Sequence, residues 1–312
     1  MGPVAVLSGE PLHGWLILYK PVGLGSTQGV AAVKRALRDA GHPKAKVGHG
    51  GTLDPLASGV LPIAIGEATK LSGRMLDADK AYDFTIRFGV ETDTLDAEGA
   101  AVATSAIRPT VAEVDAVLRR FTGPIEQVPP AYSALKVYGK RAYDLARAGE
   151  TVVLATRAIT VHALQFSPGA GRGTAEGGEV TLSARVSKGT YIRSLARDIA
   201  YALGTVGHVT MLRRTKAGPF TLAQAISLDK LEEAATGARL RELLLPLTAG
   251  LDDIPVLAVS PEQTQALRQG RRLSGIAAPP GLNLAMQGDV PIALVEVDAD
   301  VKVVRGFNLM SE

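Results

Sequence analysis

Alternation of apolar and polar residues predicts the strands of this chain. The clearest run is 82–88, where Tyr82, Phe84, Ile86 and Phe88 alternate with polar side chains. Successive strand side chains point to opposite faces, so this run predicts a strand with one buried face. The same pattern predicts a strand over 180–186, and shorter apolar runs predict strands at 16–19, 61–65, 292–297 and 301–304.

Apolar residues spaced three and four apart predict helices over 26–41, 110–121, 192–203 and 261–270. Ser260 can cap the last of these helices, and Pro261 suits its first position. Arg193 falls in the first turn of the helix that follows the 180–186 strand. Catalytic groups often lie at such ends of rigid elements. Arg193 is therefore a candidate site residue.

The length of 312 residues fits about two domains. The character of the chain changes near residue 250, where Ile254-Pro255 reads as a linker and a β-rich segment follows. We therefore predict a larger domain over 1–250 and a smaller one over 255–312. Within the first, residues 128–149 begin near a Pro-Pro pair and then mix basic with aromatic residues. This composition predicts an exposed excursion rather than core.

The composition excludes several kinds of chemistry. The chain has no cysteine, which excludes disulfides, thiolate nucleophiles and cysteine-based metal centres. Its five histidines lack the spacing of a zinc motif, and we expect neither a metal nor a cofactor. The apolar run 15–19 is far too short to cross a membrane, and we recognise no targeting signal. We therefore expect a cytoplasmic protein with no membrane partner.

Basic residues gather in three places, although the net charge is only +3. Seven basic residues and one acid lie between Arg185 and Lys216, and smaller basic groups lie over 34–46 and 136–147. Such islands fit contacts with a polyanion, and each fits solvated surface charge about equally well. The charge pattern alone leaves both interpretations open.

The most unusual stretch is the segment 48–62, which begins within the glycine-rich loop that we read over 46–51. Its Asp54-Pro55 bond disfavours helical geometry at Asp54, and the flanking glycines permit sharp turns and a close approach to a ligand. The segment thus presents one carboxylate on a stiff loop. An isolated Asp-Pro turn is common, so this dipeptide alone favours a purely structural role. A phosphate-binding loop is excluded because no Gly-Lys-Ser/Thr ending follows.

The whole block around Asp54 favours a functional role over a purely structural one, because this block and four further motifs occur together and in order. In this respect the chain resembles the TruB family of tRNA pseudouridine synthases over residues 14–220. The motifs are Lys20-Pro21, the block 48–70, Asp79-Lys80 with Tyr82 and 89–99, the stretch 127–143, and 187–193 with Leu212-Arg213-Arg214.

The resemblance implies an α/β (α+β) fold, with a mixed and mainly antiparallel sheet in the catalytic domain. It also implies a thumb inserted at 124–152 and a small β-rich, PUA-like C-terminal domain that binds RNA. The implied activity is conversion of uridine 55 in the T-arm of tRNA to pseudouridine, without metal or cofactor. The sequence suggests no obligate interface, and we expect a monomer.

The resemblance also assigns roles to residues of the catalytic centre. Asp54 is the implied nucleophile, adding either to the base or to the sugar, and Arg193 is its guanidinium partner. Tyr82 matches a tyrosine that stacks on the target base and is a candidate to take the C5 proton. Tyr191 lies near the base, and Leu212 matches a leucine of the uracil pocket. Without the resemblance, the aromatic and leucine side chains would be read as core.

A further set of residues is implied in RNA binding. His49 matches a histidine proposed to fill the place that the flipped base leaves, although a loop histidine bonded to backbone is nearly as good an interpretation. The remaining expected contacts are Lys20 in the first motif and Lys136, Lys140 and Arg141 in the thumb.

Two other functional classes compete with this interpretation. A non-catalytic tRNA-binding or RNA-chaperone protein would show the same basic islands, but it would not need Asp54, Tyr82 and Arg193 together. A glycoside hydrolase usually needs two carboxylates that face the bond. Asp93 and Asp96 are the only nominees for the second, and they lie in a motif that the synthase family already accounts for.

Overall fold

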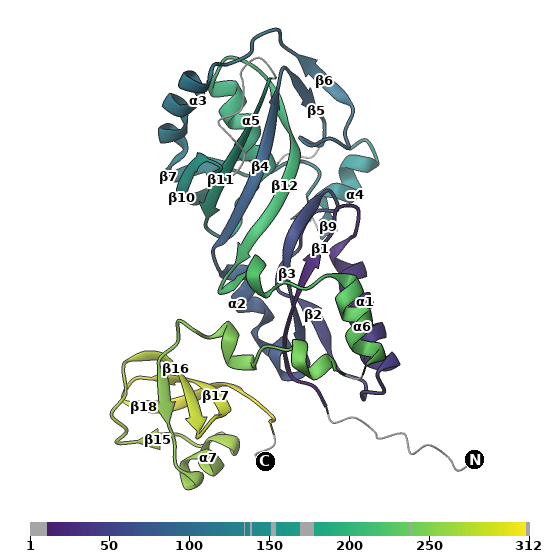
Figure 1. The fold of residues 1–312 in the computed structure, drawn as a ribbon. Helices are drawn as coiled ribbons and strands as arrows, with labels where there is room; N and C mark the ends of the chain where they lie inside the picture. The colour runs from purple at the N-terminus through teal and green to yellow at the C-terminus, as the bar shows by residue number, and fades with distance from the viewer. Residues whose placement is uncertain are drawn as a thin grey trace, which may run out of the picture.

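The molecule is built on two β-sheets (Figure 1). A computed structural model describes residues 11–309, apart from residues 134, 138, 151–153, 169–177 and 238. The larger sheet has nine strands from residues 14–221, and the smaller has five strands from residues 256–306. Two short strand pairs complete the β structure of this part of the chain.

The order of the large sheet is β1-β3-β12-β4-β11-β10-β7, with β2 beside β3 and β13 beside β12. Its strands are β1 (Gly14–Lys20), β2 (Val47–His49), β3 (Ala57–Ile65), β4 (Lys80–Phe88), β7 (Gly123–Gln127), β10 (Arg157–Phe166), β11 (Glu179–Val186), β12 (Gly207–Ala217) and β13 (Phe220–Thr221). Every pair is antiparallel except β3 with β12. The mixed, mainly antiparallel sheet that was predicted is confirmed.

Two helical layers bury the sheet through separate apolar cores. The helices are α1 (Ser26–Asp39), α2 (Ser72–Asp77), α3 (Val111–Leu118), α4 (Ala142–Arg147), α5 (Ile192–Ala202), α6 (Leu228–Thr236) and α7 (Pro261–Arg268). Helices α3 and α5 pack on β4, β10, β11 and β12, burying Phe84, Ile86 and Phe88 as the alternation predicted. Helices α1 and α6 pack on β1, β2 and β3. The α1, α5 and α7 predictions are confirmed within two residues at each end.

The central strand β12 was not predicted, although it joins the two halves of the sheet. Its sequence carries Arg213, Arg214 and Lys216 and lacks clean alternation. Two register shifts against β4 explain this, because each bulge changes which residues face the core. Strands β10 and β16 were also missed. Residues 47–49, read as loop, form the edge strand β2 against β3.

The C-terminal sheet is the β-rich unit that the sequence predicted, and its order is β14-β16-β17-β18-β15. The strands are β14 (Val256–Ala258), β15 (Leu273–Ser274), β16 (Gly281–Gln287), β17 (Val290–Val297) and β18 (Asp300–Gly306). It lies at the end of the molecule away from α3 (Figure 1). Ser260 caps α7 as predicted, with its Oγ accepting from the amide of Gln263.

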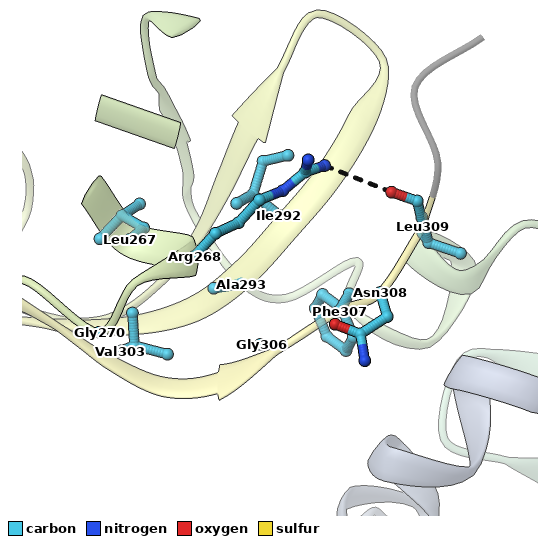
Figure 2. A pocket seen from close by; sticks show the side chains of 10 residues that line it. All are labelled: Leu267, Arg268, Gly270, Ile292, Ala293, Val303, Gly306, Phe307, Asn308 and Leu309. Carbon is cyan, nitrogen blue, oxygen red and sulfur yellow. Dashed lines mark hydrogen bonds between the residues drawn. The ribbon is translucent and has the colours of Figure 1, made fainter. Parts of the chain in front are cut away.

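A hollow of about 570 Å³ opens in this small sheet. Figure 2 shows that Leu267, Ile292 and Phe307 contribute apolar walls, and that Arg268 donates to the carbonyl of Leu309 at 3.3 Å. Its lining residues come from α7 and the turn that follows it, β17, β18 and the segment after β18. The hollow is therefore separate from the Asp54 loop.

The predicted excursion 128–149 leaves the sheet after β7. It holds the paired strands β8 (Lys136–Val137) and β9 (Lys140–Arg141) and helix α4. Gln127 and Ser133 at its root are nevertheless buried. The pair β5 (Val90–Thr92) and β6 (Ala101–Thr104) forms a second hairpin off the sheet. No helix among the described residues is long and apolar enough to span a membrane.

Candidate active site

Asp54 lies on the loop that joins β2 to β3, and the loop is held at several points. Ser26 at the start of α1 clamps Leu53, since its Oγ accepts from the Leu53 amide at 2.8 Å and donates to the Leu53 carbonyl at 2.9 Å. The amide of Gly23 donates to the carbonyl of Pro55 at 2.8 Å. Neighbouring backbone on both sides of Asp54 is therefore fixed by the β1–α1 region.

Arg193 forms an ion pair with Asp54, as predicted, and the distance from Nη2 to Oδ2 is 2.8 Å. The guanidinium is buried, whereas the Asp54 side chain is 39% exposed and open to a ligand. Nη1 donates to the Thr94 carbonyl at 2.8 Å and to Asp96 at 3.3 Å. Nη2 also donates to the Tyr132 carbonyl at 3.0 Å. Because Nη1 is directed to residues 94 and 96, a fork with both Nη atoms on Asp54 is not formed.

A small cavity of about 100 Å³ lies in front of this ion pair. It brings together five residues that the sequence nominated, from four separate segments: Asp54, Tyr82, Tyr191, Arg193 and Leu212. Tyr82 and Leu212 come from β4 and β12, and both also pack against the apolar core. Tyr82 and Leu212 therefore pack against the core and line the cavity at the same time.

Tyr191, which also lines the cavity, is partly buried. Tyr191 precedes α5, and its amide donates to Gln127 Oε1 at 2.8 Å. Burial raises the pKa of its hydroxyl above the ordinary value. Tyr191 therefore remains a neutral, protonated wall of the cavity at physiological pH.

Sequence comparison accounts for this combination of loop, ion pair and cavity. The profile of the N-terminal domain of the TruB family pseudouridylate synthases matches residues 36–192. The profile of the tRNA pseudouridylate synthase B C-terminal domain matches residues 193–252. The chain is 65% identical to the tRNA pseudouridine synthase B of Novosphingobium aromaticivorans, over 96% of this chain and 98% of that protein. It belongs to the TruB family of pseudouridylate synthases.

Other members and solved structures agree with this assignment. The chain is 61% identical to the tRNA pseudouridine synthase B of Zymomonas mobilis, over 96% of this chain and 97% of that protein. A crystal structure of a Cbf5-Nop10-Gar1 complex aligns with a TM-score of 0.70 and 26% identity, over 94% of this chain and 84% of that chain. An H/ACA RNP bound to a substrate RNA containing 2'-deoxyuridine has the same fold, with a TM-score of 0.68 and 24% identity over the same shares.

For this TruB family member, Lys20 occupies a different place from the one expected. Its side chain is fully buried at the end of β1, so it cannot touch RNA directly in this structure. Nζ donates to the carbonyls of Pro21, Leu24 and Pro55, and the last contact reaches the Asp54 loop. Burial, partly offset by the charge of Asp54, lowers the Lys20 pKa to about 8. Lys20 is thus a support of the loop.

His49 lies at the end of β2, paired with Ile63, and it does not line the cavity. Its Nδ1 is buried and has no hydrogen-bond partner among the described residues. Burial and the nearby charge of Arg214 lower its pKa, so the ring is neutral at physiological pH. Its expected role in replacing the flipped base remains a prediction.

The thumb residues lie outside the cavity. Lys140 is exposed at the start of β9. Lys136 and Arg141 lie in β8 and β9, and their side chains fall outside the part of the chain that is described. Ser194 and Arg197 of α5 both donate to the Val128 carbonyl, at 2.8 and 3.2 Å. The root of the thumb is therefore attached to the helix that carries Arg193.

Two residues of the site were missed in the sequence. Asp96 was noted as part of the 89–99 motif and as a nominee for a second glycosidase carboxylate, but it is buried and paired with Arg193. Arg214 is only 1% exposed and donates to carbonyls on both sides of Asp54. Its position in the Leu212-Arg213-Arg214 motif was a signal. However, the burial of Arg214 could not be predicted, because the residue is charged and its strand, β12, was not predicted.

Proposed function

We propose that this chain converts uridine 55 in the T-arm of tRNA to pseudouridine, with Asp54 as the nucleophile. The observation that carries the proposal is the Asp54–Arg193 ion pair, which faces a small cavity lined by Tyr82 and Leu212. The Arg193 guanidinium holds the Asp54 carboxylate at the cavity, where the carboxylate can act as a nucleophile.

The reaction is an isomerisation that balances without a further reactant. The bond between ribose C1' and uracil N1 breaks, and a bond between C1' and C5 forms. The proton leaves C5, and N1 of the rotated base becomes protonated. Asp54 provides the transient covalent partner, either on the base or at C1', and it is released at the end. No oxidant, reductant or metal takes part in this balance.

The cavity is small, so the target nucleotide must leave its stack to enter it. Base flipping costs a few kcal/mol, and stacking on an aromatic side chain returns about 1–3 kcal/mol per base. Tyr82 supplies the aromatic face and Leu212 an apolar wall. These magnitudes are comparable, so stacking together with phosphate contacts can sustain the flipped state.

The proposed RNA contacts outside the cavity are cations of the thumb. The thumb supplies cations, with Lys140 exposed beside Lys136 and Arg141 in sequence. Phosphate contacts of this kind position the substrate and carry no sequence information. Selection of one uridine is then expected to depend on the shape of the folded T-arm and on the fit of the flipped base in the cavity.

The arrangement disfavours a glycoside hydrolase. Asp96 is buried behind Arg193, and Asp93 accepts from the amide of Ala100 at 2.9 Å. Neither carboxylate lines the cavity, which contains Asp54 as its one acidic residue. The two carboxylates that usually flank a glycosidic bond are therefore absent from this cavity.

The test is tritium release from unmodified tRNA labelled at uracil C5. The wild-type chain should release tritium, and Asp54→Asn should not, because the amide cannot act as nucleophile. Asp115→Asn, an exposed carboxylate on α3, is the matched control and should behave as wild type. A tRNA whose residue 55 is cytidine should give no release with any variant.

The possible outcomes separate the candidates. Turnover by Asp54→Asn would refute the nucleophile role. Tight tRNA binding with no release by the wild-type chain would instead favour the non-catalytic RNA-binding interpretation. Release from the tRNA with cytidine at position 55 would refute the assignment of the modified site.

A further inference from the structure

Arg214 holds the catalytic loop at both of its ends. Its Nε donates to the Val60 carbonyl at 2.8 Å, Nη1 to the Thr52 carbonyl at 3.1 Å and Nη2 to the Gly51 carbonyl at 3.2 Å. Residues 51 and 52 precede Asp54, and residue 60 follows it in β3. One rigid guanidinium plane therefore fixes the spacing between the two arms of the loop.

The backbone of Arg214 also connects this loop to the stacking tyrosine. In the large sheet, Arg214 pairs with Gly59 of β3 on one side and with Tyr82 of β4 on the other. A Cβ at position 59 would lie 2.2 Å from the Arg214 carbonyl oxygen, so only glycine allows this close approach. Arg214 is thus the residue at which the two elements carrying Asp54 and Tyr82 meet.

The hydrogen-bond acceptors around the Arg214 side chain differ from those of an ordinary ion pair. The side chain is buried, and its hydrogen bonds within the described part of the chain go to backbone carbonyls. Burying a guanidinium costs free energy, which its hydrogen bonds must offset. An apolar side chain could fill such a site without that cost. The five-donor geometry of arginine is therefore the property that the loop requires.

We propose that Arg214 is a positioning residue for the isomerisation, which sets the place of the Asp54 carboxylate relative to Tyr82. The proposal rests on the proposed nucleophile role of Asp54. Arg214 acts through the loop carbonyls and is not assigned any contact with RNA. Its loss should therefore lower the rate of the chemical step and leave the affinity for tRNA unchanged.

The experiment measures kcat and KM for unmodified tRNA with Arg214→Lys and Arg214→Gln. Lysine keeps the charge, but its single nitrogen cannot replace the three nitrogens that arginine spreads over one plane. Glutamine keeps two donors without the charge. A displacement of a reacting group by about 1 Å can cost roughly 100-fold in rate. We expect kcat to fall by about 10- to 100-fold in both variants, with KM within about twofold of wild type.

Val114→Ala is the matched control for a loss of stability alone. Val114 is fully buried in the α3 core and belongs to no part of the site. It should lower the melting temperature while kcat, measured well below that temperature, stays unchanged. A kcat for Arg214→Lys within about twofold of wild type would overturn the proposal. The proposal would also be overturned if Val114→Ala, at the same stability as Arg214→Lys, lost as much kcat as Arg214→Lys does.

The two proposals fail in different ways. If Asp54→Asn is inactive and Arg214→Lys is fully active, the nucleophile stands and the positioning role falls. If Asp54→Asn retains turnover, the nucleophile role falls, and the positioning role that rests on it falls as well. Should Arg214→Gln fail to fold, Arg214→Lys preserves the charge and still decides the question.

Discussion

At the scale of single residues, the site depends on two buried arginines with different tasks. Arg193 combines a carboxylate that faces the cavity with one that is buried behind it, Asp54 and Asp96. The side chain of Arg214 donates to three backbone carbonyls. Arginine suits both places because its planar donors point in fixed directions. Lysine, which has a point charge on a flexible stem, suits neither.

Replacing Arg193 by lysine should therefore impair catalysis severely. The ammonium cannot hold Asp54, Asp96 and the carbonyls of Thr94 and Tyr132 together. We expect kcat to fall by about 100-fold or more, comparable to the loss of a preorganised donor in other active sites. The measurement is the single-turnover rate at saturating enzyme. Arg87→Lys, at an exposed pair with Glu179, should retain the wild-type rate, and a near-normal rate in Arg193→Lys would argue against the pairing.

Lys20 gives the chain a pH dependence of stability. Its folded pKa of about 8 lies below the ordinary 10.5, so between these values the unfolded chain binds more protons than the folded one. The free energy of unfolding therefore rises with pH across this window through Lys20, by at most about 1.4 kcal/mol per pH unit for one proton.

Urea unfolding between pH 8 and 9.5 checks this expectation. Lys20→Met should show a shallower rise of unfolding free energy with pH than the wild type. Part of the rise should remain, because burial also lowers the pKa of Lys80 to about 8. Lys230→Met, at an exposed lysine of α6, should leave the slope unchanged. Identical slopes in Lys20→Met and the wild type would contradict the cause assigned here.

At the scale of elements, α5 connects the chemistry to the thumb. Its first turn carries Arg193, and Ser194 and Arg197 bind the Val128 carbonyl at the thumb root. Arg193 itself holds the Tyr132 carbonyl. The segment that is proposed to contact RNA is thus attached to the helix whose Arg193 holds Asp54, the proposed nucleophile.

The thumb cations can be tested by the salt dependence of binding. Changing Lys136, Lys140 and Arg141 to alanine should weaken tRNA binding and reduce the slope of log K against log salt by about 1 for each lost phosphate contact. The rate at saturating tRNA should change little. Binding titrations at several salt concentrations give both values. The control removes Arg119, Arg120 and Lys230, which are exposed elsewhere, and an equal slope change there would contradict the thumb assignment.

At the scale of the whole molecule, the two sheets share an apolar core. Leu284, Leu294 and Phe307 of the C-terminal part pack in one cluster with Trp15 and Met75 of the catalytic part. Polar contacts reinforce it: Arg74 binds Asp253 at 2.8 Å, and the Asn308 amide donates to Glu67 at 2.6 Å. The C-terminal unit is therefore expected to stabilise the catalytic part.

Phe307→Ala tests this coupling. Truncating a buried phenylalanine typically costs about 3–5 kcal/mol of unfolding free energy. We expect one cooperative unfolding transition, shifted to lower denaturant for both parts together. Tryptophan fluorescence follows the catalytic part through Trp15, and circular dichroism follows the whole chain. A separate early transition with unchanged Trp15 fluorescence would show that the parts unfold independently.

The oligomeric state can be measured by light scattering. A molar mass of 32.5 kDa in solution would support the expected monomer.

The sequence by itself determined the elements whose signal is local. Alternation gave β4 and β11, helical spacing gave α1 and α5, and the Asp-Pro block with its accompanying motifs gave Asp54, Tyr82, Arg193 and Leu212 as a set. These features could be predicted because each depends on residues that are close together in the chain, or on motifs that occur in a fixed order.

Only the tertiary structure decided which charged residues lie inside the molecule. Lys20, Asp96 and Arg214 look like surface residues in the chain, and they are buried because loops and strands distant in sequence supply their partners. The strand β12 was missed for the same reason, since its bulges and buried arginine follow from pairing with β3 and β4. A buried charge is stable only where its partners converge, and that convergence is a property of the fold.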